Sequence, residues 1–336
     1  MEVASSHRQI PVTEASQPSA ARSAARDAAE MAGFGEEDSY RAGLVATELA
    51  TNLVKHATGG ELLVRHTRLS PKAELELIAI DRGPGIADLS RSLADGYSTA
   101  GTSGTGLGAI RRLADEFDVH SDQRGTVVVA RLREKRAKAV DQAAMEIAGI
   151  SVAMRGEMVC GDSWQIHRDV DSALIVVADG LGHGLQAWQA SSAAVTSVDV
   201  HGVLDTVGLL RAMHDGLRST RGAAAAVADI RLRQHIVKYA GIGNISATLT
   251  ATTVTRHLVS SNGILGHEAH QFREFTYPWE SGTTFVVHSD GLGTHWSLDE
   301  YRGLRSRQPT TMAAVLYRDF SRQRDDVTVV VGRQRV

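Results

Sequence analysis

The chain of 336 residues is long enough for two domains, and its 43% hydrophobic and 22% charged residues exclude a fully disordered protein. A formal net charge of −3 gives no electrostatic signature of a nucleic-acid partner, and the single cysteine, Cys160, excludes an intramolecular disulfide and a four-cysteine zinc site. No apolar run approaches the roughly 20 residues that span a bilayer, and the first 20 residues lack a signal-peptide core, so we expect a cytoplasmic protein without a membrane partner.

Helix and strand patterns alternate over the first 133 residues. The polar segment before residue 21 contains many serines and predicts a mobile tail over residues 1–20. In chain order we expect helices over 21–32 and 36–58, strands over 61–68 and 73–81, a glycine-rich stretch over 83–108, a helix over 106–115, and strands over 117–121 and 126–133. This order predicts a layered α/β domain over residues 21–133.

The segment 134–148 is charged and then alanine-rich, without a turn signal, and we expect it to form a helical linker. From Gly149 onward short β-type runs dominate. The expected strands are 150–154, 163–168, 173–179, 223–230, 235–240, 246–250, 253–259, 284–288 and 327–332, and the expected helices are 185–217 and 310–320. These runs predict an α+β domain with many antiparallel strands over residues 149–336.

Polar side chains with catalytic potential lie in the second expected helix, in the run ATELATNLVKHA. Glu48 and Asn52 are four residues apart and therefore share one helix face, and Lys55 lies one turn further on. A carboxylate can orient or deprotonate an attacking hydroxyl, and an amide oxygen suits Mg²⁺. A solvated helix face shows the same residue types, so this segment alone does not establish a site.

Two segments rich in glycine follow this helix. In IAIDRGPGI, Asp81 ends an apolar strand and can accept a hydrogen bond from an exocyclic amine such as that of adenine, while Gly83 and Gly85 permit a sharp turn. In GTSGTGLGAIRRLAD, glycines precede or open a helix, whose free N–H groups are suited to an anion. No Gly-Lys-Ser/Thr follows them, which excludes a Walker loop.

The order and spacing of these three segments resemble the Bergerat-fold ATPases, and ELATNLVKHA in a short domain is most similar to the RsbT-like anti-sigma-factor serine kinases. The resemblance covers about residues 22–133. It implies that Asn52 holds the Mg²⁺ of bound ATP, that Asp81 binds adenine and that Glu48 is the general base. The other nucleotide-binding residues that it implies are Lys55, Gly83, Gly85, Gly104, Thr105, Gly106 and Gly108.

Two related activities need to be separated from a serine kinase. Glu48 also matches the base of ATPases that transfer no phosphoryl group to protein, so it does not distinguish the two. A histidine kinase is disfavoured because only about 20 residues precede the first expected helix, too few for a phosphoacceptor hairpin. His56 lies inside the nucleotide helix, which makes it a poor phosphoacceptor.

Acidic residues in the second domain recur at or near strand ends. Asp162 precedes a strand in MVCGDSW, Asp179 ends the apolar run of LIVVADGLGHG, and Asp290 ends that of FVVHSDGLG; Asp325 and Asp326 precede VTVVV. Carboxylates at the ends of adjacent strands can converge on one spot, where Mn²⁺ or Mg²⁺ prefers oxygen ligands. One Asp-Gly after a strand is usually a turn, but the whole set in this order indicates a metal site.

This set resembles the PPM-type metal-dependent protein phosphatases, and ADGLGHG before a helix is similar to their SpoIIE and RsbX branch. The resemblance covers about residues 148–336. It implies a site for two Mn²⁺ or Mg²⁺ ions that activate a water for attack on phosphorus, with Asp162, Asp179 and Asp290 at the catalytic centre. The metal ligands that it implies are Asp162, Asp179, the Gly180 carbonyl, Asp290, Asp325 and the neighbouring Asp326.

Other reactive side chains were weighed against this interpretation. Cys160 next to Gly161-Asp162 suggests a cysteine phosphatase, but no arginine stands in the C-x5-R position, which is occupied by an isoleucine. His183 follows Asp179 by four residues and can serve as a proton donor or phosphate contact, or equally as a capping and packing residue. For His288 a structural role is favoured.

The resemblances together predict an α+β protein of two domains, with an N-terminal Bergerat ATPase α/β sandwich and a C-terminal PPM-phosphatase α-β-β-α sandwich. They imply a serine/threonine kinase joined to a phosphoserine/phosphothreonine phosphatase in bacterial partner switching. The expected substrate is a STAS-domain protein of the anti-sigma-antagonist or stressosome type, and a sigma factor or downstream switch protein is a further expected partner. Two alternatives stay open: an N-terminal domain that senses ATP without phosphotransfer, and one that binds a sigma factor.

Overall fold

The computed structural model describes residues 2–3, 6–57, 59–69, 72–93, 106–134, 143–201, 204–252 and 254–335. The chain divides into two compact units. The N-terminal unit contains His7–Val140 and Ser297–Asp319; the C-terminal unit contains Met1–Ser6, Asp141–Trp296 and Phe320–Val336. No helix in the described ranges is both long and apolar enough to cross a lipid bilayer.

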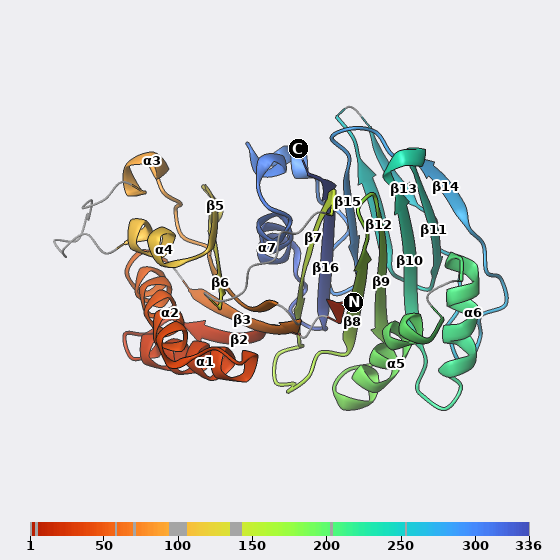
Figure 1. Cartoon of the computed structure of the whole chain (residues 1–336), viewed down its shortest axis with the longest axis horizontal. Coiled ribbons are helices and arrows are strands. Elements are labelled where there is room, and N and C mark those ends of the chain that lie inside the picture. The colour runs from red at the N-terminus through yellow and green to blue at the C-terminus, as the bar shows by residue number, and fades with distance from the viewer. Residues whose placement is uncertain are drawn as a thin grey trace. The chain divides into compact units, whose positions relative to one another are not determined.

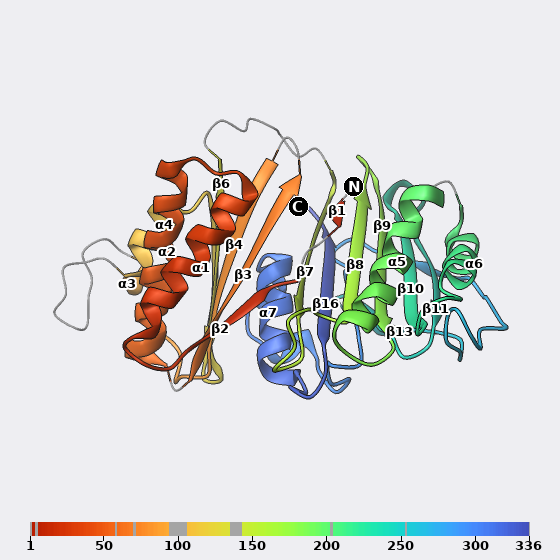
Figure 2. The same cartoon turned by 90° about the horizontal axis from the view of Figure 1, so that it is seen from below.

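A five-stranded antiparallel sheet forms the centre of the N-terminal unit (Figure 1). Its strands, in spatial order, are β2 (Arg8–Val12), β3 (Gly60–Leu69), β4 (Lys72–Asp81), β6 (Gly125–Arg133) and β5 (Glu116–Asp122). The helices of the N-terminal segment are α1 (Gln17–Ala32), α2 (Glu36–His56), α3 (Leu89–Ser92) and α4 (Leu107–Leu113). Helices α1 and α2 pack against each other and cover one face of this sheet (Figure 2).

Successive side chains of each strand point to opposite faces of this sheet, and both faces are apolar. In β4, Leu75 and Leu77 belong to the core beneath α1 and α2, whereas Ile78 and Ile80 have the opposite parity and are no more than 1% exposed. A second element must therefore cover the other face. Helix α2 fits the first face because its apolar residues recur at helical spacing. The acidic residues Glu36–Asp38 in its first turn and Lys55 in its last turn interact favourably with the helix dipole.

The element on the second face comes from the C-terminal half of the sequence. Helix α7 (Pro309–Phe320), preceded by the short 3₁₀ turns η2 (Leu298–Glu300) and η3 (Leu304–Ser306), groups with the N-terminal unit and lies across the sheet from α1 and α2 (Figure 2). Asp118 of β5 accepts hydrogen bonds from the Gln308 backbone N–H at 2.8 Å and from the Thr311 hydroxyl at 2.7 Å. It thereby caps the N-terminus of α7 as an N-cap side chain would. At the other end, the Tyr317 hydroxyl bonds to Glu61 at 3.3 Å.

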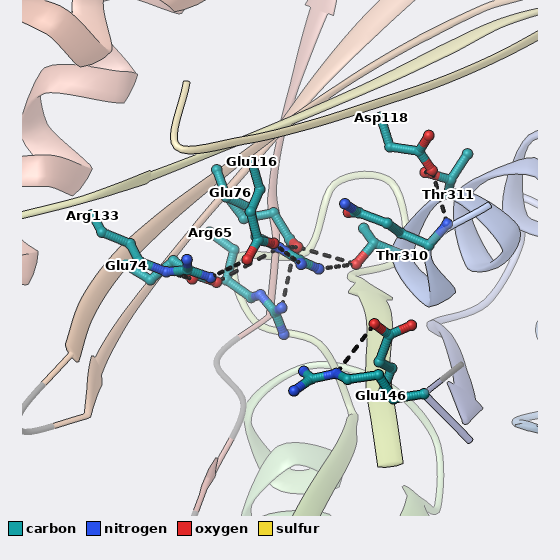
Figure 3. Close-up of polar contacts among 12 residues, drawn as sticks. Arg65, Glu74, Glu76, Glu116, Asp118, Arg133, Glu146, Thr310 and Thr311 are labelled. Carbon is teal, nitrogen blue, oxygen red and sulfur yellow. Dashed lines mark hydrogen bonds and ion pairs between the residues drawn. The ribbon is translucent and has the colours of Figure 1, made fainter. Parts of the chain in front are cut away.

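A charged network lies beneath the first turn of α7 (Figure 3). Glu76 is fully buried and accepts hydrogen bonds from Arg65 at 2.8 Å and Arg131 at 2.7 Å, and it pairs with His7 at 3.1 Å. Thr310 of α7 bonds to both Glu76 and Arg131. Burial alone would raise the pKa of Glu76, but Arg65, Arg131 and His7 outweigh it and hold that pKa well below its ordinary value.

Two sheets and a helical layer form the C-terminal unit. One sheet has the order β1 (Glu2–Val3), β8 (Asp162–Arg168), β9 (Ser172–Gly180), β10 (Ala223–Arg231), β11 (Ile236–Ile242), β14 (Phe275–Pro278). The other has the order β13 (Thr255–Leu258), β12 (Ser246–Thr250), β15 (Thr284–His288), β16 (Val327–Gln334), β7 (Met145–Val152). One apolar core joins the two sheets, and a second lies between the first sheet and helices α5 (Leu185–His201) and α6 (Thr206–Gly216). The turn η1 (Leu232–Gln234) links β10 and β11.

The structure corrects three expectations from the sequence. The tail expected over residues 1–20 is wrong, because this segment contains β1, β2 and the first turn of α1, which begins at Gln17. Alternating burial of Ile10 and Val12 places β2 in the sheet. The helical linker expected over 134–148 is wrong for its last part, because β7 begins at Met145, and residues 135–142 lie outside the described part of the chain. The long helix expected over 185–217 is divided, because the Asp205 side chain accepts a bond from the Gly208 N–H and starts a new helix there.

Replacing Glu76 tests whether the network stabilises the N-terminal unit. Glu76→Gln leaves two buried guanidinium groups short of a charge, so we expect a loss of about 3 kcal/mol in the free energy of unfolding measured with urea. Glu74→Gln is the matched control, because Arg131 and Arg133 keep Glu116; its expected loss is below about 1 kcal/mol. Because the pKa of Glu76 is depressed, its contribution is present above about pH 4.3 and disappears as pH falls through the lower folded-state pKa. Equal losses in the two variants would contradict this account.

Candidate functional site

A cavity of about 630 Å³ in the N-terminal unit brings the predicted nucleotide residues together. Glu48, Asn52 and Lys55 line it from α2, and Asp81 lines it from the end of β4. The other predicted residues on its wall are Gly85 and Gly106. The cavity is therefore built from all three sequence segments singled out above, although up to 58 residues separate them along the chain.

Helical spacing explains why α2 presents these side chains to the cavity. Leu49 and Leu53 point into the apolar core, which leaves the positions one residue before them on the adjacent face. Glu48, Asn52 and Lys55 occupy that face and are less than fully buried. Burial raises the pKa of Glu48, and the nearby Lys55 opposes this shift. A raised pKa suits a carboxylate that must accept a proton from a hydroxyl.

Asp81 is held in place by the turn that follows it. Its Oδ1 accepts hydrogen bonds from the Gly83 N–H at 2.7 Å and from the Thr126 N–H at 3.1 Å. Burial raises the pKa of Asp81, while these bonds and the charge of Arg318 lower it. The carboxylate is thus fixed in orientation on the cavity wall, as an acceptor for an amine must be.

The glycines of the turn have different structural roles. Gly85 has φ of +78°, and a Cβ there would lie 2.1 Å from the Asp122 carbonyl oxygen, so glycine is required. Gly83 is buried, and a Cβ there would lie 2.9 Å from the His56 carbonyl oxygen. Gly106 precedes α4 and Gly108 lies within it; Gly104 and Thr105 lie outside the described residues.

In the C-terminal unit the predicted metal ligands gather at one end of the two sheets. Asp162 and Asp179 are direct cross-strand partners in β8 and β9, and Gly180 follows Asp179. Asp290 follows β15, and Asp326 immediately precedes β16, its neighbour. The Ser289 N–H bonds to the Thr328 carbonyl oxygen at 3.0 Å, which brings these two strand ends together.

Burial, together with mutual repulsion, raises the pKa values of these carboxylates. Burial raises the pKa of Asp162 to about 7 and that of Asp179 to about 9, and the charges of the other aspartates add to both shifts. Burial likewise raises the pKa of Asp325 and of Asp326. In the described ranges, no three acidic, histidine or cysteine side chains already stand in metal-ligating geometry. Oxygen donors that repel one another nevertheless fit a divalent cation, because its positive charge would offset the cost of burying several carboxylates together.

Several contacts at this site were not predicted from the sequence. The Ser289 hydroxyl donates to Asp162 Oδ2 at 2.6 Å, and the Asn244 amide donates to Asp290 Oδ2 at 2.7 Å. Ser289 could have been suspected because it directly precedes Asp290, whereas Asn244 lies 46 residues away. His183 pairs with Glu157 at 2.6 Å on the exposed loop after Asp179. Ser289 and Asn244 thus each orient one carboxylate of the cluster.

Cys160 and His288 are both buried and hydrogen-bonded within the protein. Burial raises the pKa of the Cys160 thiol well above its usual range, and Asp162 and Asp326 raise it further, so the thiolate is strongly disfavoured. His288 is buried, with Nδ1 donating to the Ser289 carbonyl oxygen at 2.8 Å and Nε2 accepting from Trp296 at 3.4 Å. Both ring nitrogens are thus engaged in hydrogen bonds within the protein, which favours the structural role proposed from the sequence.

Comparison with known proteins assigns each part of the chain to a family. Residues 10–132 match the model of the histidine kinase-like ATPase domain, and residues 169–335 match that of stage II sporulation protein E (SpoIIE). Over 102 residues the chain is 39% identical to the serine/threonine-protein kinase RsbT of Bacillus subtilis (strain 168), covering 30% of this chain and 77% of RsbT. The chain belongs to the histidine kinase-like ATPase family. Its C-terminal domain is of the SpoIIE type.

The SpoIIE-type domain has relatives of its own. It is 25% identical over 179 residues to the phosphoserine phosphatase RsbX of the same organism, covering 53% of this chain and 89% of RsbX. A crystal structure of RsbX in complex with magnesium matches with a TM-score of 0.52 and 22% identity, covering 59% of this chain and 98% of that one, which shows a shared fold. The predicted two-domain α+β fold and both resemblances are thereby confirmed.

Replacing Asp81 tests the ATPase cavity. Asp81→Asn removes the charged acceptor, so we expect Mg-ATP affinity measured by calorimetry to fall roughly tenfold or more. Asp27→Asn, exposed on α1, is the control and should bind like the wild type. Unchanged affinity in Asp81→Asn would refute the assignment of this cavity.

Replacing Asp179 tests the carboxylate cluster. Because the pKa of Asp179 is raised, the metal-free domain loses stability as pH rises from about 4 toward 9. The wild type must bury the Asp179 charge or take up a proton on folding, and Asp179→Asn avoids this cost, so at pH 7.5 in EDTA we expect its Tm to rise by about 2 °C or more. Mn²⁺ should stabilise the wild type and leave this variant unaffected, while Asp215→Asn should behave as wild type. A lower Tm of Asp179→Asn in EDTA would contradict the raised pKa of Asp179.

Proposed function

We propose that the protein is a bifunctional regulator of bacterial partner switching, a serine/threonine kinase and a metal-dependent phosphoserine/phosphothreonine phosphatase in one chain. The observation that carries the proposal is the single cavity on which Glu48, Asn52 and Asp81 converge. The carboxylate cluster at the ends of β8, β9, β15 and β16 supports the phosphatase half.

In the ATPase domain, the division of labour follows from position on the cavity wall. Asp81, fixed by two backbone N–H groups, accepts the adenine amine, and Asn52 supplies the amide oxygen for the Mg²⁺ of ATP. Lys55 lies one turn beyond Asn52 and balances phosphate charge. Burial raises the pKa of Glu48 more than the charge of Lys55 lowers it, and this raised pKa lets Glu48 take the proton of a serine or threonine hydroxyl. Gly104, Thr105, Gly106 and Gly108 are proposed to wrap the phosphates.

In the SpoIIE-type domain, the ligands proposed for two Mn²⁺ or Mg²⁺ ions are Asp162, Asp179, the Gly180 carbonyl, Asp290, Asp325 and Asp326. Bound ions supply a water of low pKa and neutralise phosphate oxygens. The residues of this chain orient the ligands: Ser289 fixes Asp162, and Asn244 fixes Asp290. The magnesium complex of RsbX supports this choice of cofactor.

The proposed substrate is a serine or threonine of a STAS-domain protein, of the anti-sigma-antagonist or stressosome type. Support comes from similarity to a serine/threonine-protein kinase and to a phosphoserine phosphatase within one chain. A sigma factor or downstream switch protein is the further partner proposed. We place the protein in the cytoplasm, where such partners reside.

Labelled ATP and a candidate STAS protein test the two activities separately. Glu48→Gln should bind ATP yet lose phosphotransfer by roughly 10²–10⁴-fold, since a general base contributes that much. Asp290→Asn should keep phosphotransfer and lose Mn²⁺-dependent removal of the label, and thus serves as the reciprocal control. If the wild type leaves every cognate STAS protein unlabelled in saturating Mg-ATP, while ATP alters its phosphatase rate, the kinase proposal fails and an ATP sensor replaces it.

A further inference from the structure

The segment that contains η2, η3 and α7 lies in the sequence between Asp290 and Asp325, two of the proposed metal ligands. The chain leaves the C-terminal unit after Trp296 and returns to it at Phe320, and everything between belongs to the N-terminal unit. Both ends of the segment therefore continue directly into the loops that carry these ligands. A change in how α7 is held within the N-terminal unit acts on both loops through the peptide chain itself.

The last turn of α7 is anchored by a buried arginine. Arg318 is 1% exposed, and its guanidinium donates to both oxygens of Asp319 at 2.7 and 2.9 Å and to Asp122 of β5 at 3.3 Å. The Arg82 guanidinium donates to the Arg318 carbonyl oxygen at 2.5 Å. The Tyr301 hydroxyl donates to Asp319 at 2.6 Å. Side chains from two strand ends of the ATPase sheet thus hold the main chain and the side chain of one residue.

The turn after the first of these strand ends also lines the nucleotide cavity, through Asp81 and Gly85. Arg82 directly follows Asp81, and the backbone of Gly85 lies against the Asp122 carbonyl oxygen with no room for a Cβ. On the other side, Gly125 has φ of +134°, and a Cβ there would lie 2.0 Å from the Asp81 carbonyl oxygen. The turns at 81–85 and 122–125 are therefore packed directly against each other. The first turn thus contains Arg82 and contacts Asp122, the two residues that hold Arg318.

Beyond Asp319, short backbone contacts continue to the metal-ligand loops. The Gly293 N–H donates to the Phe320 carbonyl oxygen at 2.9 Å, and the Arg322 N–H donates to the Gly291 carbonyl oxygen at 2.9 Å. A Cβ on Gly291 would lie 2.0 Å from the Asp326 carbonyl oxygen, so the loops after Asp290 and before β16 are in direct contact. The residues that follow α7 thus fix the spacing between the two loops.

We propose that Arg82 and Arg318 are positioning residues through which nucleotide in the ATPase cavity sets the geometry of the phosphatase site. The inference rests on the proposed function of both sites and names the regulation of the second by the first. Bound nucleotide orders the 81–85 turn, this turn fixes Arg318 through Arg82 and Asp122, and the loops bearing Asp290 and Asp325 are held at the spacing that ions require. Nucleotide is therefore an activator of the phosphatase.

Hydrogen exchange provides a readout that does not depend on activity. Mg²⁺ with the non-hydrolysable analogue adenylyl imidodiphosphate, at constant free Mg²⁺, should slow amide exchange in residues 288–293 and 320–326 of the wild type. The same analogue should lower the Mn²⁺ concentration for half-maximal hydrolysis of p-nitrophenyl phosphate by about fivefold or more, the usual lower range of coupling between sites. In Arg82→Ala the change in amide exchange and the change in Mn²⁺ requirement should both fall below about twofold. Nucleotide affinity and the basal phosphatase rate should be preserved. Arg82→Lys should restore part of both changes.

Tyr317→Phe is the matched control, because it removes a contact of the same helix with Glu61 while leaving Arg82, Arg318 and Asp122 in place; it should respond as the wild type does. Asp122→Asn provides a second variant that weakens the ion pair with Arg318 and should lose the response. A full response in either Arg82→Ala or Asp122→Asn, or a wild type that binds the analogue without any response, overturns the inference and leaves the proposed activities standing. A wild type that does not bind the analogue fails the proposed function instead.

Discussion

A sheet with two apolar faces needs cover on both, and this constraint organises the N-terminal unit. Helices α1 and α2 cover the face that carries Leu75 and Leu77, and α7 covers the face that carries Ile78 and Ile80. Charged residues lie on this second face as well, so α7 must satisfy hydrogen bonds in addition to excluding water. Asp118 and Glu76 meet this need by accepting from Thr311 and Thr310. An element of the SpoIIE-type match thus completes the ATPase unit.

The charge pattern makes this cover specific to one helix. A purely apolar face would accept any amphipathic helix. The network of Glu76 with Arg65 and Arg131 instead favours a helix with a hydroxyl at the position that Thr310 occupies in α7. Asp118 in turn favours a helix whose N-terminal N–H groups lie within reach of its carboxylate, as that of Gln308 does. The buried polar groups on the second face therefore define the register of α7. Burying them costs desolvation free energy, which is visible at nearby Glu74, whose pKa is raised by burial.

Sequence patterns predicted what depends on local spacing and missed what depends on distant partners. The face of α2 with Glu48 and Asn52, the turn after Asp81 and the aspartates at strand ends all follow from helix and strand periodicity, and the structure gathers the first two in one cavity. Strand β2 was missed because Pro11 and polar neighbours conceal a short edge strand whose partner lies 50 residues away. Asn244 and the docking of α7 were missed because their partners lie 46 residues or more away along the chain.

Chain connectivity and spatial units do not coincide in this protein, which affects how it can be divided. A break in the backbone between residues 134 and 143 would separate the two family matches in sequence. It would not release the fragments, since α7 of the second fragment would remain bonded to Asp118, Glu76 and Glu61 of the first. The two halves would behave as a split protein that reassembles without a covalent link. Conversely, residues 1–140 produced alone would expose Ile78 and Ile80 and would tend to self-associate.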